Sequence, residues 1–180
     1  MSEQKGFTLW FTGLSGAGKT ALAKELVPVL RERGLKVERL DGDIVRQSLT
    51  KDLGFSAEDR DTNIERVTFV AKLLTRNGVA VLASFISPYI ARRDKSRAEI
   101  GSFVECYVEC DLDTLIERDV KGLYKKALSG EIKNFTGVSD PYEPPPNPEI
   151  AVHSGTQTIE ESKAIILQRL EELGYLPKAD

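Results

Sequence analysis

A stretch near the start of the chain has the residue types and the spacing of a phosphate-binding loop. It fits the pattern G-x-x-x-x-G-K-[ST] at every constrained position, and it comprises Gly13, Leu14, Ser15, Gly16, Ala17, Gly18, Lys19 and Thr20. The glycines let main-chain N–H groups turn inward around an anion, which a Cβ would obstruct. Lys19 can reach the β- and γ-phosphates, and the hydroxyl of Thr20 can ligate Mg²⁺. The pattern therefore predicts a nucleoside triphosphate site.

Two aspartates separated by one glycine, Asp41 and Asp43, form the second candidate group. Mg²⁺ bound to a nucleotide usually needs a strand-end aspartate that holds metal-bound water. The most apolar strand ends in residues 84–87, which supply none. We assign Asp41 to Mg²⁺ through water and Asp43 to the hydroxyl that attacks, although the two roles can be exchanged. The alternative is an Asp-Gly turn with two solvated carboxylates.

Side chains that can bind a substrate follow these aspartates. Arginine suits sulfate and phosphate oxygens because its two parallel N–H bonds form at once. Arg46 and Arg60 are therefore candidates, with Asn63 nearby, although an arginine taken alone is more commonly a solvated surface charge. Phe55, isolated in a polar loop, can stack on a base or simply anchor the loop.

The elements that must position these groups alternate between strand and helix. Apolar runs predict strands at residues 7–12, 35–40, 79–86, 103–110 and 150–152. One helical pattern follows the P-loop and a second covers residues 64–77. Two more begin at Ser87 as N-cap and at the capping box of Thr158. Between residues 51 and 61 we expect a polar connection. The alternation predicts an α/β fold with a mainly parallel five-stranded sheet flanked by helices, whose carboxyl-terminal strand ends carry the site.

The segment from residue 129 to residue 148 has no periodicity and contains five prolines. A stretch of this length inside a compact domain is usually a functional loop. We expect a mobile lid over about residues 120–150 within a single domain of residues 1–180.

The bulk composition excludes several classes of protein. With 41% hydrophobic and 29% charged residues among 180, the chain is typical of a soluble globular domain. A net charge of −3 argues against non-specific nucleic-acid binding. No apolar run approaches the roughly 20 residues that cross a bilayer, and residues 1–5 lead directly into the first strand, so we expect no membrane contact, no signal peptide and a cytoplasmic location. Cys106 and Cys110 share a strand face and are expected to be small buried hydrophobes.

Over almost its whole length the sequence resembles adenylyl-sulfate kinase, a family of P-loop kinases that phosphorylate the 3′-hydroxyl of adenosine 5′-phosphosulfate. The P-loop alone indicates only a nucleotide. Further blocks are specific to the family, and they comprise residues 40–43, 51–56, 58–60, 86–89, 121–127, 130–133, 135–137 and 140–144.

The resemblance implies a three-layer P-loop kinase fold and a set of site residues. ATP would be held by the P-loop, by Arg118 and by a lid over residues 121–133, with Mg²⁺ as cofactor. The residues implied to surround adenosine 5′-phosphosulfate are Asp43, Arg46, Phe55, Arg60, Asn63, Ile86, Ser87, Lys133 and Phe135. Phe55 and Phe135 would sandwich its adenine. The resemblance also suggests a homodimer and functional coupling to ATP sulfurylase.

The family assigns Ser87 as a phosphoserine intermediate. An N-cap hydroxyl needs a nearby base to become a nucleophile, and none is evident locally. We therefore expect direct in-line transfer with Ser87 binding substrate.

The sequence departs from the family pattern at Ile44, where asparagine is expected, and at Leu128, where arginine is frequent, and also at Ile90 and Arg92. Two other functions stay open: another small-molecule P-loop kinase, acting on a nucleoside monophosphate or a sugar acid, and a non-catalytic nucleotide-binding regulatory domain. A GTPase is weaker still, because no Asn-Lys-x-Asp segment occurs.

Overall fold

The computed structural model describes residues 4–178 and contains one five-stranded sheet. The expectation that no signal segment precedes the first strand concerns residues 1–5, of which residues 1–3 lie outside the described part. All strand pairs are parallel, and the strand order is β2-β3-β1-β4-β5. The strands are β1 (Phe7–Thr12), β2 (Val37–Asp41), β3 (Ala80–Ser84), β4 (Phe103–Glu109) and β5 (Ile150–His153). The five predicted strands are therefore present, each within a few residues of its expected bounds.

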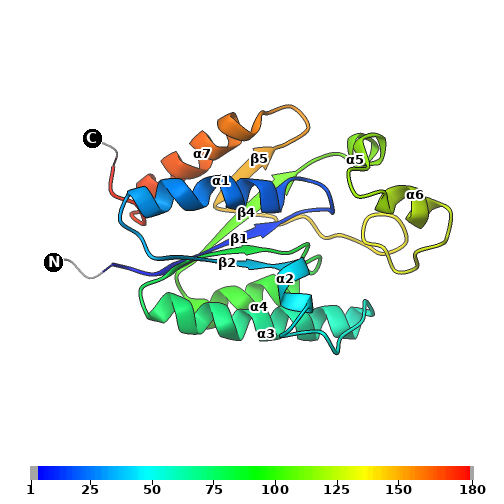
Figure 1. The fold of residues 1–180 in the computed structure, drawn as a ribbon, viewed down its shortest axis with the longest axis horizontal. Coiled ribbons are helices and arrows are strands. Elements are labelled where there is room, and N and C mark those ends of the chain that lie inside the picture. The colour runs from blue at the N-terminus through cyan, green and yellow to red at the C-terminus, as the bar shows by residue number, and fades with distance from the viewer. Residues whose placement is uncertain (1–3, 179–180) are drawn as a thin grey trace.

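Helices cover both faces of this sheet and give three layers (Figure 1). α1 and α7 pack together on one face, and α3 and α4 pack together on the other. The helices are α1 (Lys19–Glu32), α2 (Gly42–Arg46), α3 (Ala57–Arg76), α4 (Ile90–Ile100), α5 (Leu112–Arg118), α6 (Leu123–Leu128) and α7 (Ile159–Glu172). Within residues 4–178, no helix is both long and apolar enough to cross a membrane.

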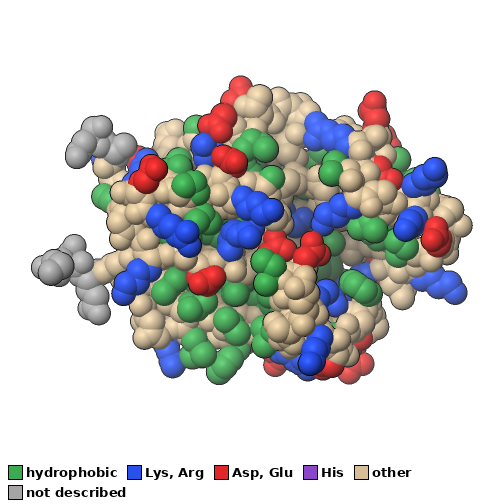
Figure 2. Space-filling view, in the orientation of Figure 1, with side chains coloured by type: hydrophobic (Ala, Val, Ile, Leu, Met, Phe, Trp, Pro, Cys, Tyr) green, Lys and Arg blue, Asp and Glu red, His purple; other side chains and the backbone are tan. Residues whose placement is uncertain are grey.

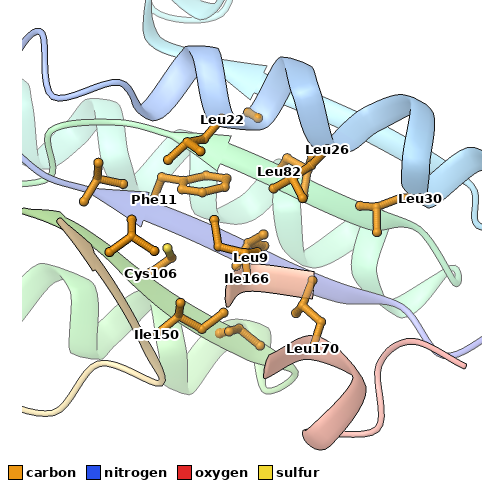
Figure 3. Close-up of a cluster of buried hydrophobic side chains, with 14 of the residues drawn as sticks. Leu9, Phe11, Leu22, Leu26, Leu30, Leu82, Cys106, Ile150, Ile166 and Leu170 are labelled. Atoms are coloured by element: carbon orange, nitrogen blue, oxygen red, sulfur yellow. The ribbon is translucent and has the colours of Figure 1, made fainter. Parts of the chain in front are cut away.

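Alternation along β1 divides the core between the two faces. Leu9 and Phe11 point toward α1 and α7, where they meet Leu26 and Ile166 (Figure 3). Trp10 points the opposite way and packs between aromatic rings on the side of α3 and α4. Burial of such side chains stabilises the fold by about 1.5–3 kcal/mol each.

The two cysteines lie in the larger of these clusters. Cys106 and Cys110 are buried on the same face as Val104 and Val108, and both thiols are free. Burial raises the pKa of the Cys106 thiol well above its usual range. The prediction that they are small buried hydrophobes is confirmed.

The predicted polar connection at residues 51–61 is wrong in its second half. Helix α3 begins at Ala57, because the Ser56 hydroxyl accepts a hydrogen bond from the amide of Asp59 at 3.1 Å and caps its first turn. The early start places Arg60 and Asn63 on the first two turns of α3.

The predicted helix start at Ser87 is also wrong. Helix α4 begins three residues later at Ile90, after the extended Tyr89. Ser87 has a φ of 44°, and its hydroxyl points into the interior instead of capping the helix. The strand before it ends at Ser84, so residues 85–89 form a loop at the carboxyl end of this interior strand.

The expected lid region contains one short helix, α6, and a segment, residues 129–149, without helix or strand beyond one isolated bridge from Thr136 to Asp140. Figure 1 shows α6 and this segment projecting beyond the carboxyl ends of the strands.

A close backbone approach at Gly6 holds β1 against the end of α3, and it gives a test of the fold. A Cβ at Gly6 would lie 2.0 Å from the Thr75 carbonyl oxygen, whereas a Cβ at Gly155 would meet only side-chain atoms at 3.6 Å or more. Neither glycine has a positive φ. We expect Gly6→Ala to lower the free energy of unfolding by about 2 kcal/mol or more, and Gly155→Ala to change it by less than about 0.5 kcal/mol. Urea denaturation followed by circular dichroism measures both, and equal effects would contradict the prediction.

Candidate functional site

The P-loop connects the end of β1 to the first turn of α1. Its main chain packs tightly against β4, since a Cβ on Gly13 would lie 2.5 Å from the Val108 carbonyl oxygen. Gly18 precedes the helix with a φ of 103°, a conformation that favours glycine. The loop therefore ends with the N–H groups of a helix N-terminus, which favour a bound anion.

Lys19 lies inside this loop and is largely buried. Its Nζ donates hydrogen bonds to the carbonyl oxygens of Gly13 and Leu14, at 2.7 and 2.8 Å. Burial, and then the positive charge of Lys121, lower the pKa of Lys19 to about 7, although Asp41 opposes the shift. An ammonium group in this position gains from a neighbouring anion such as a phosphate.

Asp41 and Asp43 differ sharply in their surroundings. Asp41 is buried, and its carboxylate accepts a 2.7 Å hydrogen bond from the Thr20 hydroxyl and a 3.1 Å hydrogen bond from the amide of Asp43. The side chain of Asp43 is 82% exposed and lies 3.8 Å from the Nζ of Lys121. One carboxylate therefore faces the P-loop helix, and the other faces open space and the lid.

Arg46, Phe55 and Arg60 lie near Asp43, since the charges of Asp43 and Arg60 both act on Arg46 and Phe55 packs against it. The Arg46 guanidinium lies 4.2 Å from the centre of the exposed Phe55 ring, and it donates to the Gly54 carbonyl oxygen. Arg60 contacts two parts of the lid segment, pairing with the Asp140 carboxylate at 2.8 Å and donating to the Asn134 carbonyl oxygen.

Asn63 is buried on α3, and its Oδ1 has no hydrogen-bond partner among residues 4–178. Buried polar atoms are usually paired, so this unpaired oxygen marks Asn63 as a candidate for contact with a ligand.

Ser87 is less accessible than the sequence suggests. Its residue is 3% exposed, and its hydroxyl accepts from the Trp10 indole at 2.9 Å while it donates to the Phe85 carbonyl oxygen at 3.1 Å. The neighbouring Ile86 is held by its own carbonyl oxygen, which accepts from the Thr12 hydroxyl. The loop thus has a fixed main chain directly beside the end of β1.

Further predicted residues lie at the end of α5 and in the lid. Arg118 lies at the end of α5, where its guanidinium donates to the Ser154 carbonyl oxygen and its side chain lines a pocket beside Gly16. Lys133 is exposed. Phe135 meets Tyr124 edge-on with ring centres 5.1 Å apart. In this structure the ring of Phe135 therefore packs against Tyr124, and the ring of Phe55 packs against Arg46.

Sequence reasoning did not single out Tyr124 as a site residue. Its hydroxyl donates to the Ser15 carbonyl oxygen at 2.6 Å, and this contact ties α6 to the P-loop. Position 124 lies inside one of the blocks that carry the family resemblance, but nothing in the residue type indicates this partner.

Of the positions that depart from the family pattern, Ile44 and Leu128 are exposed, at 52% and 57%.

Figure 2 shows where these groups converge. Acidic and basic side chains meet around a hollow at the carboxyl ends of the strands, between α2 and the lid region. The contacts above join the same parts of the chain: Asp41 bonds Thr20 of the P-loop, Asp43 lies beside Lys121, and Arg46 lies against Phe55.

Comparison with known proteins identifies the family. The model of the adenylylsulphate kinase family matches residues 5–153. A probable adenylyl-sulfate kinase of Pseudomonas aeruginosa is 67% identical over 169 residues, which cover 94% of this chain and 79% of that protein. A probable bifunctional SAT/APS kinase of Sorangium cellulosum is 60% identical, and the match covers 96% of this chain but 30% of that larger protein.

Among solved structures, the APS kinase CysC of Mycobacterium tuberculosis in complex with AMPPNP and APS superposes with a TM-score of 0.88 at 41% identity, and the match covers 93% of this chain and 99% of that one. A match over 93% of this chain is more than a shared nucleotide-binding loop would give. The chain therefore belongs to the adenylyl-sulfate kinase family.

Proposed function

We propose that this chain transfers the γ-phosphoryl group of ATP to the 3′-hydroxyl of adenosine 5′-phosphosulfate and gives ADP and 3′-phosphoadenosine 5′-phosphosulfate. The observation that carries the proposal is the contrast between the two aspartates. Asp41 is locked onto Thr20 beside the phosphate loop, and Asp43 faces outward where an acceptor can approach. The similarity to a kinase solved with AMPPNP and APS supports both substrates.

The nucleotide half of the site is the P-loop, Lys19 and Arg118. Main-chain N–H groups and the start of α1 would surround the phosphates, while Lys19 would exchange its two carbonyl partners for phosphate oxygens. Arg118 and the pocket beside Gly16 would bind the nucleoside end. Phosphoryl transfer needs mainly positioning and charge stabilisation, and these groups supply both.

The residues present fit a magnesium ion. A hydroxyl and a carboxylate 2.7 Å apart are oxygen donors of the kind Mg²⁺ prefers, and Mg²⁺ usually takes only one or two protein ligands beside phosphates and waters. Within residues 4–178 no cluster of three or more acidic, histidine or cysteine side chains offers an all-protein cage. Thr20 would bind the ion directly and Asp41 through water. When bound, Mg²⁺ would neutralise charge on the β- and γ-phosphates.

The acceptor half lies across the hollow from the P-loop. Asp43 would accept the proton of the 3′-hydroxyl, and the exposed Lys121 beside it adds positive charge where donor and acceptor meet. Arg46 and Arg60 would bind the phosphosulfate and Asn63 would offer its unpaired oxygen, while the adenine would lie against Phe55 and Phe135. The remaining substrate contacts are proposed for Ile86, Ser87 and Lys133.

Direct in-line transfer is the mechanism that the surroundings of Ser87 favour. Its hydroxyl already has a donor in Trp10 and an acceptor in Phe85, and neither group is a base. A nucleophilic serine needs a base within hydrogen-bond reach. The contribution of Ser87 would therefore come through the shape of its loop.

Four wider proposals complete the assignment. Residues 1–180 would act as one kinase domain whose lid, about residues 120–150, closes over the substrates. The protein would be cytoplasmic and a homodimer, as the family resemblance suggests. Coupling to an ATP sulfurylase is supported by the relative in Sorangium cellulosum that is named as bifunctional.

The proposed reaction is tested with a substrate panel. The purified chain should release ADP when ATP, Mg²⁺ and adenosine 5′-phosphosulfate are present together, and much less with ATP alone. Adenosine monophosphate and gluconate serve as acceptors for the alternative kinases. Release with either of these but not with adenosine 5′-phosphosulfate would refute the assignment, and no release with any acceptor would favour a regulatory domain.

Substitutions of the two aspartates should differ in their effect on the Mg²⁺ requirement of the reaction. Asp41→Asn should raise the Mg²⁺ concentration for half-maximal activity by about tenfold or more, because the group that orients metal-bound water is weakened. Asp43→Asn should lower kcat by about 10²–10⁴-fold with little change in that Mg²⁺ concentration, because the proton acceptor is lost. Initial rates over a Mg²⁺ titration measure both, and the reverse pattern would exchange the two roles.

The Phe55 ring should matter for the acceptor and not for ATP. Phe55→Ala should raise KM for adenosine 5′-phosphosulfate by about tenfold, since stacking a base on an aromatic ring contributes about 1–3 kcal/mol. Phe69→Ala is the matched control, because Phe69 is exposed to nearly the same extent, 58% against 60%, but lies on the outer surface of α3. A rise confined to KM for ATP, or an equal effect of the control, would contradict the proposed site.

A further inference from the structure

Arg93 on α4 is a buried arginine that the proposed reaction does not use. It is 1% exposed, although arginine is almost never fully buried unless it is paired. Its guanidinium makes three contacts in three directions. Nε donates to the Glu105 carboxylate at 3.1 Å, Nη1 to the Ser87 carbonyl oxygen at 2.5 Å, and Nη2 to the Glu143 carbonyl oxygen at 2.6 Å.

The two carbonyl groups belong to segments that are far apart in the sequence. Ser87 lies in the loop after β3, and Glu143 lies in the strap, which we define as residues 140–143 of the lid segment. Further hydrogen bonds join the same two segments. The amide of Glu143 donates to the Pro88 carbonyl oxygen at 2.8 Å, and the amide of Ile90 donates to the Glu143 carboxylate at 3.1 Å.

The strap also contacts the substrate side of the site directly. The Tyr142 hydroxyl is 2.8 Å from the hydroxyl of Thr12, and this same threonine holds the Ile86 carbonyl oxygen. Asp140, at the other end of the strap, pairs with Arg60. The strap and the loop after β3 are therefore joined by several contacts. Together they hold Ser87 and Ile86 and orient Arg60, which are three of the residues proposed to bind the acceptor.

The conformation of Ser87 requires such support. Its φ of 44° is unfavourable for a residue with a Cβ and persists only when surrounding contacts hold it. Trp10 holds the side chain of Ser87, and Arg93 holds its carbonyl oxygen. The charge of Arg93 is balanced separately, by Glu105, so the two carbonyl contacts are not needed for neutrality.

We propose that Arg93 is a positioning residue that clamps the Ser87 loop to the strap and so fixes the wall of the acceptor pocket. The inference rests on the proposed function and adds to it. It also limits which part of the lid can move. The strap is hydrogen-bonded to the body of the protein, so only the lid residues before Asp140 would open and close.

Arg97 provides a matched control for the test. It lies one turn further along α4, contacts the same Glu105, and pairs with Glu149, but it bonds neither Ser87 nor the strap. Arg93→Lys keeps the charge but loses the planar fork that reaches three acceptors. Arg93→Met with Glu105→Met removes the buried pair as a unit, which proteins often tolerate, and also removes both carbonyl contacts.

Two readouts separate positioning from stability. We expect Arg93→Lys and the double variant to raise KM for adenosine 5′-phosphosulfate by about tenfold or more, with KM for ATP changed less than about twofold. Without substrate, hydrogen exchange at the amides of Ile90 and Glu143 should quicken by about tenfold or more, because the clamp no longer holds them. Arg97→Met should change neither quantity, whatever it does to the melting temperature.

The outcomes are decisive. Folded Arg93 variants with an unchanged KM for the acceptor, or with unchanged exchange at these amides, would overturn the proposal. A double variant that does not fold would assign Arg93 to stability alone and would overturn it as well. An inactive wild-type enzyme would refute the proposed reaction itself, whereas an active one with unaffected variants refutes only the role of Arg93.

Discussion

The site depends on three parallel strands that end at the same level. In the register of the sheet, Asp41 of β2 lies opposite Ser84 of β3, and Ser84 lies opposite Phe11 of β1. Because strands in a parallel sheet run in one direction, their carboxyl ends share one edge. The register therefore sets the Asp41 carboxylate beside the first turn of α1, where the Thr20 hydroxyl reaches it. A shift by one residue would turn Asp41 to the opposite face of the sheet.

Electrostatics at this edge favour an anionic ligand. The chain as a whole carries a net charge of −3, yet the positive charge of Lys121 acts on Lys19 at the P-loop, and Arg118 lines a pocket beside Gly16. Burial and the neighbouring cation both lower the pKa of Lys19, so its protonated form is held at a cost in the absence of a ligand. A bound triphosphate would offset that cost, so the local charge at the P-loop favours a polyanion although the chain as a whole is acidic.

The sheet, the P-loop and the irregular lid segment were predictable from the sequence because they depend on local patterns. A continuous apolar run such as residues 79–86 is typical of a central strand, and Lys19 and Thr20 are constrained by spacing alone. The start of α3 was missed because the pattern of apolar residues begins only at Ile64, several residues after the cap at Ser56. Ser56 itself is an ordinary N-cap signal.

The tertiary contacts of the site were not predictable in this way. Ser-Pro is a common helix start, but Trp10 and Arg93 hold Ser87 in a conformation that no local rule indicates. Arg93 is one of several basic residues on a polar helix, and its burial arises from Glu105 and Glu143, which are distant in sequence. Such partners require the fold to be known.

Trp10, the single tryptophan of the chain, lies completely buried beneath this loop and donates its indole N–H to the Ser87 hydroxyl. Indole fluorescence is sensitive to hydrogen bonding and to the polarity of its surroundings. The tryptophan emission of the protein therefore originates from one ring beneath the Ser87 loop, and the molecule contains its own optical probe of that loop without any added label.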